Sequence, residues 1–485
     1  MTQAFPNQVK FIPLIIIVAV VTGLWFFVTP PEGIGIPAWH TVIIFVGCIV
    51  AIVANVLPIG AIGLIGITIY GVTFAGGDTS TKDAMTRALS ELDSALIWLI
   101  VCAFLIARGF IKTGLGRRIA LLMIKFLGKR TLGLAYGLAI ADLILAPAMP
   151  SNTARCGGVI YPIANALSLS YDSKPNDVSS KKMGTFLITC IGNVNDMTSA
   201  IFMTAFTGNL LAVSLAKQAG VNITWGSWFL AAVVPCIIAL LLVPLLVYLI
   251  TQPETKRTPD APRMAQTQLD EMGKMSYGEW MMLITIVLLL VLWVFGSQLH
   301  VHSTAAALIG LSFLLLSSTL TWDDIKAEKG AWDTLIWFAA LLMMATQLKV
   351  LGFTDWFGTV IGTELQSWVG DMHWILILLI LNAIYIYTHY FFASGNAQIA
   401  ALYTVFLGVA TALDVPVIVA AFMLGFSSNI YCSLTQYTHA RGPILFGSGY
   451  VSTGKWWMVG FASTILNQTI FFTAGLAWWK IIGLY

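Results

Sequence analysis

The chain has 485 residues, of which 58% are hydrophobic and 10% are charged, and its formal net charge is +3. Its mean hydropathy is +0.86, whereas about a quarter of the residues of a soluble domain are charged. A soluble fold of this size has no interior large enough to bury so many apolar side chains. The composition therefore excludes a soluble enzyme, a nucleic-acid-binding protein and a disordered chain. It predicts an all-α polytopic membrane protein embedded in the lipid bilayer.

Apolar runs that are long enough to cross a membrane occupy most of the chain. A helical span needs about 20 apolar residues, and the run lengths predict ten to twelve spans. The candidate segments are 11–28, 39–57, 58–75, 94–111, 132–147, 184–204, 228–251, 280–297, 304–320, 333–350, 373–393, 414–431 and 457–483. No A-x-A cleavage site and no transit peptide accompany the first run. We therefore expect a retained first span and a multi-pass protein of the bacterial inner (plasma) membrane.

Two polar segments separate these runs. Residues 252–278 form the longest charged stretch, which we expect to be a cytoplasmic linker between two membrane halves. Residues 108–130 contain seven of the 25 Lys and Arg residues, arranged around an apolar face. This pattern predicts an amphipathic helix on the membrane surface, and the positive-inside rule places that helix in the cytoplasm.

The two halves of the chain contain matching segments. Leu96-Ile97-Trp98 recurs as Leu335-Ile336-Trp337, and the polar break at 150–154 recurs at 393–397. The surface segment of the second copy, 349–371, has three acidic residues and a single lysine, which predicts that it lies outside. Matching segments with opposite flanking charge predict two repeats of inverted topology, the plan of many secondary transporters.

The first polar break contains the strongest functional signal. Pro147 and Pro150 interrupt the helix, and Ser151 begins a run of short polar side chains that can cap a following helix at 154–169. Non-helical backbone at membrane depth is tolerated only against protein or a water-filled cavity. We therefore expect a re-entrant hairpin whose tip offers free amides and a helix N-terminus to an anion. An ordinary interfacial loop is the alternative.

Arg155 follows this tip directly, within an apolar run. An ionisable residue inside the membrane is a functional candidate, and we expect a fixed cation beside the anion site, with snorkelling to the interface as the alternative. Asp142 and Asp196 also lie in apolar segments, and the sequence leaves open whether either pairs with Arg155 or with a lysine. At the second tip, Gln398 stands where the first copy has Arg155.

Two further polar breaks lie downstream, at 204–209 and 435–443, each with a glycine at the bend. His439 and Arg441 add positive charge or hydrogen-bond donors to the second of them, while a lone histidine such as His389 is more often a structural residue. The predicted substrate ligands from all four breaks are Ser151, Asn152, Thr153, Arg155, Thr207, Asn209, Ser394, Gly395, Asn396, Gln398, Thr438, Arg441 and Pro443.

Other functional classes find little support in the sequence. There is no G-x-x-x-x-G-K-[ST] loop for ATP and no H-E-x-x-H or Cys/His spacing for a catalytic metal. A membrane-embedded enzyme lacks a nucleophile–base set, and two occluding tips argue against the continuous pore of an ion channel. We expect no enzyme activity, no cofactor and no metal site, with Na⁺ as the one ion to be considered.

Three stretches resemble a known family. The segment from Pro150 to Pro162, the run His389–Ser394 and the run Gly442–Val451 are similar to the divalent anion:sodium symporter family. The likeness is strongest to its exchanger branch, which includes bacterial citrate/succinate and tartrate/succinate antiporters and the plastid 2-oxoglutarate/malate translocator. The resemblance implies a homodimer with about 11 transmembrane helices plus two re-entrant hairpins, working as an elevator-type transporter. It divides the chain into a scaffold, 1–93 and 226–332, and a transport domain, 94–225 and 333–485.

The resemblance also implies the activity. It predicts a secondary active transporter that exchanges di- or tricarboxylates such as citrate, tartrate, malate, 2-oxoglutarate and succinate, and the alternative is a Na⁺-coupled dicarboxylate symporter of the same fold. In the family, Ser-Asn-Thr tips hold substrate carboxylates, and Na⁺ binds behind the tips of sodium-coupled members. Here Gly395 and Asn396 stand at the Asn and Thr positions of the second tip. We expect Arg155 to neutralise the substrate in place of Na⁺, so that an empty carrier holds an uncompensated cation and exchange is obligatory.

Overall fold

The computed structural model describes residues 9–296, 298–369, 372–392 and 394–485. Asp371 of the predicted outer segment and Ala393 of the second polar break lie outside these ranges. The described residues form helices joined by turns and loops, with no strand and one isolated bridge between Arg130 and Arg257. This confirms the prediction of an all-α polytopic membrane protein.

Within the described residues, nine helices are long and apolar enough to cross a membrane. They are α2 (Ile36–Val53), α5 (Ala95–Thr113), α7 with the turn after it (Thr131–Ala148), α11 (Trp225–Thr251), α13 (Tyr277–Val294), α16 (Lys329–Val350), α18 with the turn after it (Trp374–Phe391), α19 (Gly395–Ala412) and α22 with α23 (Thr453–Ile481). Four shorter apolar helices accompany them: α1 (Phe11–Phe27), α3 (Ile59–Val72), α14 (Ser303–Leu316) and α20 (Val417–Ile430). The first predicted span is thus α1.

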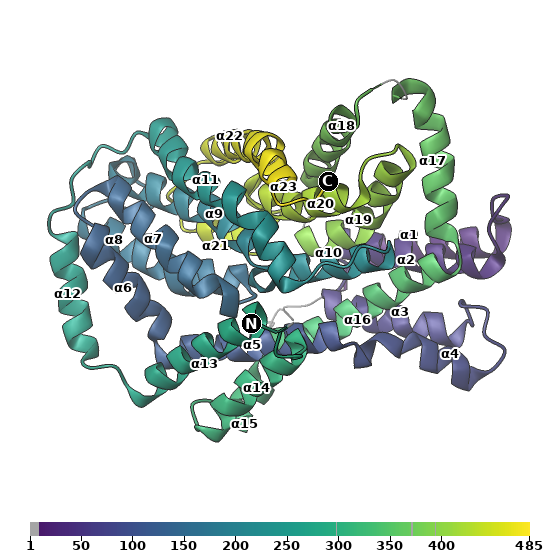
Figure 1. Ribbon diagram of the computed structural model, residues 1–485, viewed down its shortest axis with the longest axis horizontal. Helices are drawn as coiled ribbons and strands as arrows, with labels where there is room; N and C mark the ends of the chain where they lie inside the picture. Colours follow the sequence, from purple (N-terminus) through teal and green to yellow (C-terminus); the bar gives the residue numbers. More distant parts are fainter. Residues whose placement is uncertain (1–8, 297, 370–371, 393) are drawn as a thin grey trace.

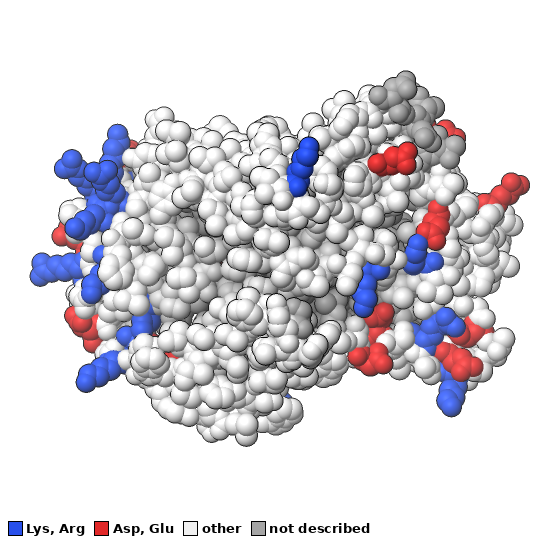
Figure 2. Space-filling view, in the orientation of Figure 1, with Lys and Arg blue, Asp and Glu red and all other residues white. Residues whose placement is uncertain are grey.

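The two predicted surface segments are helices at opposite ends of the molecule. Figure 1 shows α6 (Leu115–Leu127) at the left end and α17 (Phe353–Val369) at the right end. Lys and Arg side chains gather at the left end, whereas most Asp and Glu side chains visible in this view lie at the right end (Figure 2). This arrangement is the one that two repeats of opposite orientation require. The positive-inside rule predicts that the end with α6 faces the cytoplasm.

The predicted linker, 252–278, is an ordered cap on the end with α6 rather than a loose connection. Its helix α12 (Ala261–Met272) packs on α6. The Arg118 side chain of α6 donates to both carboxylate oxygens of Glu279 in α13, at 2.5 and 3.1 Å, and to the backbone oxygen of Gly273 at 2.9 Å. Because this bidentate pair is buried, it fastens the surface helix α6 to the start of a membrane span.

The helices pack in two groups. In one, α16 packs on α2, α3 and α5, and α5 packs on α14. Close approach depends on small residues: a Cβ at Gly63 of α3 would lie 2.9 Å from the Cα of Trp337. In the other group, α9 (Gly184–Ile201) packs on α7, α8 (Tyr161–Ser170), α11 and α20, and α11 also packs on α22.

Three helices pack against partners from the other part of the division implied by the resemblance. Helices α5 and α16, which the division assigns to the transport domain, pack with α2, α3 and α14 of the predicted scaffold. Helix α11, assigned to the scaffold, packs on α9 and α22. The position of a helix in the sequence does not determine which helices it packs against in the fold. The division into a fixed and a moving part stays a prediction.

Both polar breaks turn the chain back on itself. The first hairpin runs up α7, turns through 146–151 and returns through a π-helical turn, η3 (Ala154–Ile160), into α8. The predicted helix 154–169 is therefore π-helical in its first part. The second hairpin runs up α18 and the short helix η6 (Thr388–Phe391) and returns through α19. Gly157 in η3 lets Ile444 approach, since a Cβ there would lie 2.9 Å from Ile444 Cδ1.

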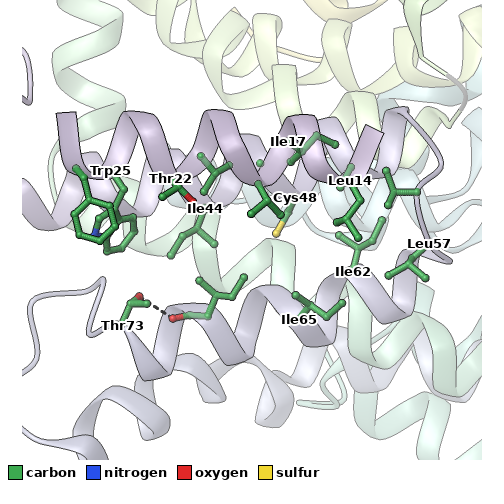
Figure 3. A pocket seen from close by; sticks show the side chains of 17 residues that line it. Leu14, Ile17, Thr22, Trp25, Ile44, Cys48, Leu57, Ile62, Ile65 and Thr73 are labelled. Atoms are coloured by element: carbon green, nitrogen blue, oxygen red, sulfur yellow. Dashed lines mark hydrogen bonds between the residues drawn. The ribbon is translucent and has the colours of Figure 1, made fainter. Parts of the chain in front are cut away.

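An apolar groove of about 330 Å³ lies between α1, α2 and α3 (Figure 3). Leu14 and Ile17 of α1 line it from one side, and Ile44 and Ile62 line it from the others. None of the predicted ligands lines it. Helix α1 has no buried residue in the single chain.

Candidate functional site

The two hairpin tips start their returning helices with the same cap. The Ser151 hydroxyl oxygen accepts a hydrogen bond from the backbone N–H of Ala154 at 3.1 Å, and Ser394 accepts one from Ala397 at 3.4 Å. A serine cap satisfies one of the four free amides of a helix start. The remaining amides and the positive end of the helix dipole stay available to an anion. Both serines therefore cap a returning helix at equivalent positions of the two matching segments.

The two tips meet at one side chain, His439. The Asn152 amide nitrogen lies 3.2 Å from His439 Nε2, although the two residues are 287 positions apart. A Cβ at Gly395 would lie 3.9 Å from His439 Cδ2, and the Phe206 ring stands 5.7 Å from the imidazole. Asn152 and His439 are only 3% and 5% exposed. The predicted tips and both downstream breaks therefore converge on one buried place.

Arg155 does not point into this place. Its guanidinium is fully buried and donates to the Asp142 carboxylate at 2.9 Å and to the backbone oxygens of Met149 at 2.7 Å and Ala205 at 3.0 Å. A fourth bond, of 2.7 Å, goes to the Ser199 hydroxyl. Snorkelling is thus excluded. The side chain lies behind the first tip, where its guanidinium donates hydrogen bonds to four residues of the protein.

Asp142 is the partner that the sequence left undecided. Its carboxylate also accepts hydrogen bonds from the Asn195 amide at 2.8 Å and from the Thr198 hydroxyl. The charge of Arg155 is therefore compensated within the protein. The expectation of an uncompensated cation in the empty carrier is wrong, because a guanidinium at membrane depth needs a counter-charge and finds it on the other arm of its own hairpin.

A second buried ion pair adjoins the first. Arg441, which precedes α21 (Gly442–Gly447), pairs with Asp196 and donates to the Ser433 hydroxyl at 3.0 Å. It also donates to the side-chain oxygen of Asn195 at 2.9 Å. Because the amide nitrogen of Asn195 bonds Asp142, this one residue links both pairs. Two arginines and two aspartates give the cluster a formal charge of zero.

Gln398 occupies the position behind the second tip that Arg155 occupies behind the first, four residues after the capping serine. Its amide nitrogen donates to the backbone oxygen of Tyr385 at 2.6 Å and to the Thr388 hydroxyl at 3.2 Å. Its oxygen is hydrogen-bonded to His389 Nδ1, and the His389 ring stacks on Tyr431 at 3.9 Å. Gln398 thus ties the two arms of its hairpin together and does not face His439.

Some of the other predicted ligands brace the core of the protein, and others lie at the tips. Asn209 donates to the backbone oxygens of Ser199 and Phe202 and accepts from Asn429 at 2.7 Å, so it braces the core. Thr438 is buried against Thr435, and Pro443 is exposed in the first turn of α21. Ser151, Asn152, Thr153, Thr207, Ser394, Gly395 and Asn396 stay with the tips and the start of α10 (Thr207–Gln218). The Asn396 side-chain oxygen is buried and has no hydrogen-bond partner among the described residues.

His439 is the contact that the predicted set lacks. The sequence shows it as one donor in a polar break, and no local pattern connects it to a tip 287 residues earlier. The sequence feature that points to His439 is its position two residues before Arg441, in a polar break that matches the one at 204–209.

Known proteins resemble this chain along its whole length. A family model described as "Sodium:sulfate symporter transmembrane region" matches residues 8–485. YflS of Bacillus subtilis is 45% identical over 480 residues, covering 99% of this chain and 98% of that protein. "Dicarboxylate transporter 2.1, chloroplastic" of Arabidopsis thaliana is 44% identical over 482 residues, covering 98% and 83%. The fold resembles the YdaH transporter of Alcanivorax borkumensis, with a TM-score of 0.58, 14% identity and coverage of 92% and 99%. The chain therefore belongs to the sodium:sulfate symporter family, which is the divalent anion:sodium symporter family, and is a multi-pass transporter of the bacterial inner membrane rather than an enzyme.

Proposed function

We propose that the protein exchanges dicarboxylate anions across the inner membrane without Na⁺ coupling. The substrate class is supported by the name of the plant relative, which is similar over nearly all of this chain. It is also supported by the chemistry of the tips, because two helix N-termini and short amide side chains at one buried place suit carboxylate oxygens. The elevator motion and the homodimer belong to the same proposal and are taken from the family.

The observation that carries the absence of Na⁺ coupling is the guanidinium of Arg155 behind the first tip. Two backbone oxygens, a hydroxyl and a carboxylate surround it. Such oxygen sets are what a hard monovalent cation would use. Here a covalently attached cation already takes those hydrogen bonds, and behind the second tip the Gln398 amide takes the Tyr385 oxygen. Both positions are thus filled by side chains that travel with the protein.

Exchange follows from the charge of the core. Because the Arg155, Asp142, Arg441 and Asp196 cluster sums to zero, a bound dianion moves with its two negative charges uncompensated. Moving one charge across a membrane costs about 2.3 kcal/mol per 100 mV, so a dianion entering alone costs about 4.6 kcal/mol per 100 mV. An outgoing dianion of equal charge cancels this cost. The reason for exchange therefore differs from the one expected from sequence.

The cluster also supports a transport core that moves as one body. Asn195 connects Asp142 in the first hairpin to Arg441 in the second break, and Asn209 is bonded to Asn429 of α20. These buried polar bonds cross between the two repeats. Breaking them inside the membrane during a cycle is costly, so both tips are expected to travel together.

Counterflow in proteoliposomes tests the proposal. Uptake of radiolabelled malate is measured into vesicles that contain unlabelled malate or buffer alone, with NaCl or choline chloride outside. We expect uptake only into malate-loaded vesicles, with equal rates in the two salts. Robust uptake into empty vesicles that follows an imposed Na⁺ gradient supports the Na⁺-coupled symporter instead.

A further inference from the structure

We propose that His439 is a positioning residue of the anion site, which orients the Asn152 amide in the first tip and replaces the side chain that Gly395 lacks in the second. The inference rests on the proposed function, since it treats Asn152 as a ligand of the substrate carboxylate. It assigns a role to a residue outside the set predicted from sequence.

The hydrogen bonds of the His439 imidazole determine which of its two nitrogens is protonated. The backbone N–H of Arg441 donates to His439 Nδ1 at 3.3 Å, so Nδ1 is an acceptor. A neutral imidazole has one N–H, which must then be on Nε2. That nitrogen lies 3.2 Å from the side-chain amide of Asn152. The histidine therefore presents a donor to the first tip.

A donor at this distance determines which way the Asn152 amide turns. The structure places the nitrogen of the Asn152 amide 3.2 Å from Nε2, and two donors do not bond each other. We therefore assign the amide with its oxygen toward the ring, where it accepts the Nε2–H, and with its NH₂ group left to donate to another acceptor. Oxygen and nitrogen of an amide are interchangeable in position, and the hydrogen-bond network decides between them. With the NH₂ group turned away from the ring, Asn152 offers donors to a carboxylate. With the opposite orientation it would offer an oxygen, which repels an anion.

The ring also stands over the second tip. A Cβ at Gly395 would lie 3.4 Å from Tyr431 Cε2 and 3.9 Å from His439 Cδ2, which are ordinary contacts. An alanine therefore fits at 395, whereas a longer side chain that continues in this direction meets the imidazole. Gly395 has no polar side chain to offer at the second tip, and the polar group beside it comes from His439. Glycine at 395 and histidine at 439 are thus two parts of one arrangement.

Four variants test this arrangement by malate counterflow in proteoliposomes. His439→Ala removes the donor that orients Asn152. We expect KM for malate to rise by up to about tenfold to a hundredfold, the loss expected when a misoriented Asn152 no longer bonds the charged carboxylate, with a smaller change in the maximal rate. His439→Gln keeps an N–H at about the place of Nε2, and we expect KM within about threefold of the wild type. Gly395→Asn alone should impair transport. The double variant Gly395→Asn/His439→Ala should transport better than either single variant.

A packing role alone predicts a different pattern. In that case His439→Gln loses as much as His439→Ala, KM does not change while the maximal rate falls, and the losses at 395 and 439 add. Any of these results overturns the inference. His302→Asn is the matched control, because His302 caps α14 by accepting from the Thr304 N–H, and asparagine caps equally well. Its kinetics should match the wild type. Absence of counterflow in the wild-type protein would instead count against the proposed function.

Discussion

The buried pair of Arg155 and Asp142 offers the sharpest test of the site, because its two side chains are 0% and 4% exposed. Removing one partner of a buried pair costs about 3–5 kcal/mol, since the other charge is left without compensation. Arg155→Ala leaves Asp142 in this condition, and Asp142→Ala leaves Arg155 with neutral acceptors only. The double variant Asp142→Ala/Arg155→Ala contains no unpaired charge. It still leaves the backbone oxygens of Met149 and Ala205 without donors, at about 1–3 kcal/mol each.

We therefore expect each single variant to be strongly destabilised and the double variant to be at least as stable as either. The assay is thermal unfolding in detergent, followed by the loss of the monodisperse peak in size-exclusion chromatography. Asp323→Ala is the control, because Asp323 forms an exposed pair with Lys326, and such pairs contribute about 0–1 kcal/mol. Losses at 142 and 155 that simply add would refute the coupling between them.

Three further predictions follow from the site and the fold. Asn152→Ala should weaken malate affinity about tenfold to a hundredfold, because a hydrogen bond to a charged group contributes roughly 1.5–3 kcal/mol; near-normal KM in a well-folded variant would remove the first tip from the site. Arg155→Ala vacates the set of oxygens around the guanidinium, so NaCl should raise its unfolding temperature above the value in choline chloride, while the wild type shows no difference; equal values in both salts would show that these oxygens do not form a cation site. Lys125→Cys and Glu364→Cys should be labelled by an impermeant maleimide from opposite sides of sealed vesicles, against a low background because all six native cysteines are buried; labelling from one side only would contradict the inverted repeats.

Much of the local structure is determined by short-range chemistry that the sequence displays. Apolar run length gives the spans, and Pro147 and Pro150 interrupt α7 where their missing N–H groups require it. Ser151 and Ser394 cap the returning helices because a hydroxyl at a helix start accepts a free backbone N–H. The opposite charges around α6 and α17 predict that these helices lie on opposite sides of the membrane. Figure 1 shows them at opposite ends of the molecule. Each of these inferences needs only neighbours within a few turns of helix.

The partners within the site depend instead on how helices cross. The apolar surroundings of Arg155 in the sequence show that it needs a counter-charge. The sequence offers both Asp142 and Asp196 as partners, and the choice between them depends on how α7 and α9 pack. Only the tertiary structure shows that Asp142 forms an ion pair with Arg155 and Asp196 with Arg441. It also brings His439 to Asn152, and it places α11 beside α9. A sequence states that a buried charge must be paired and that a helix must be covered, whereas the choice among distant partners is made by the packing of the whole core.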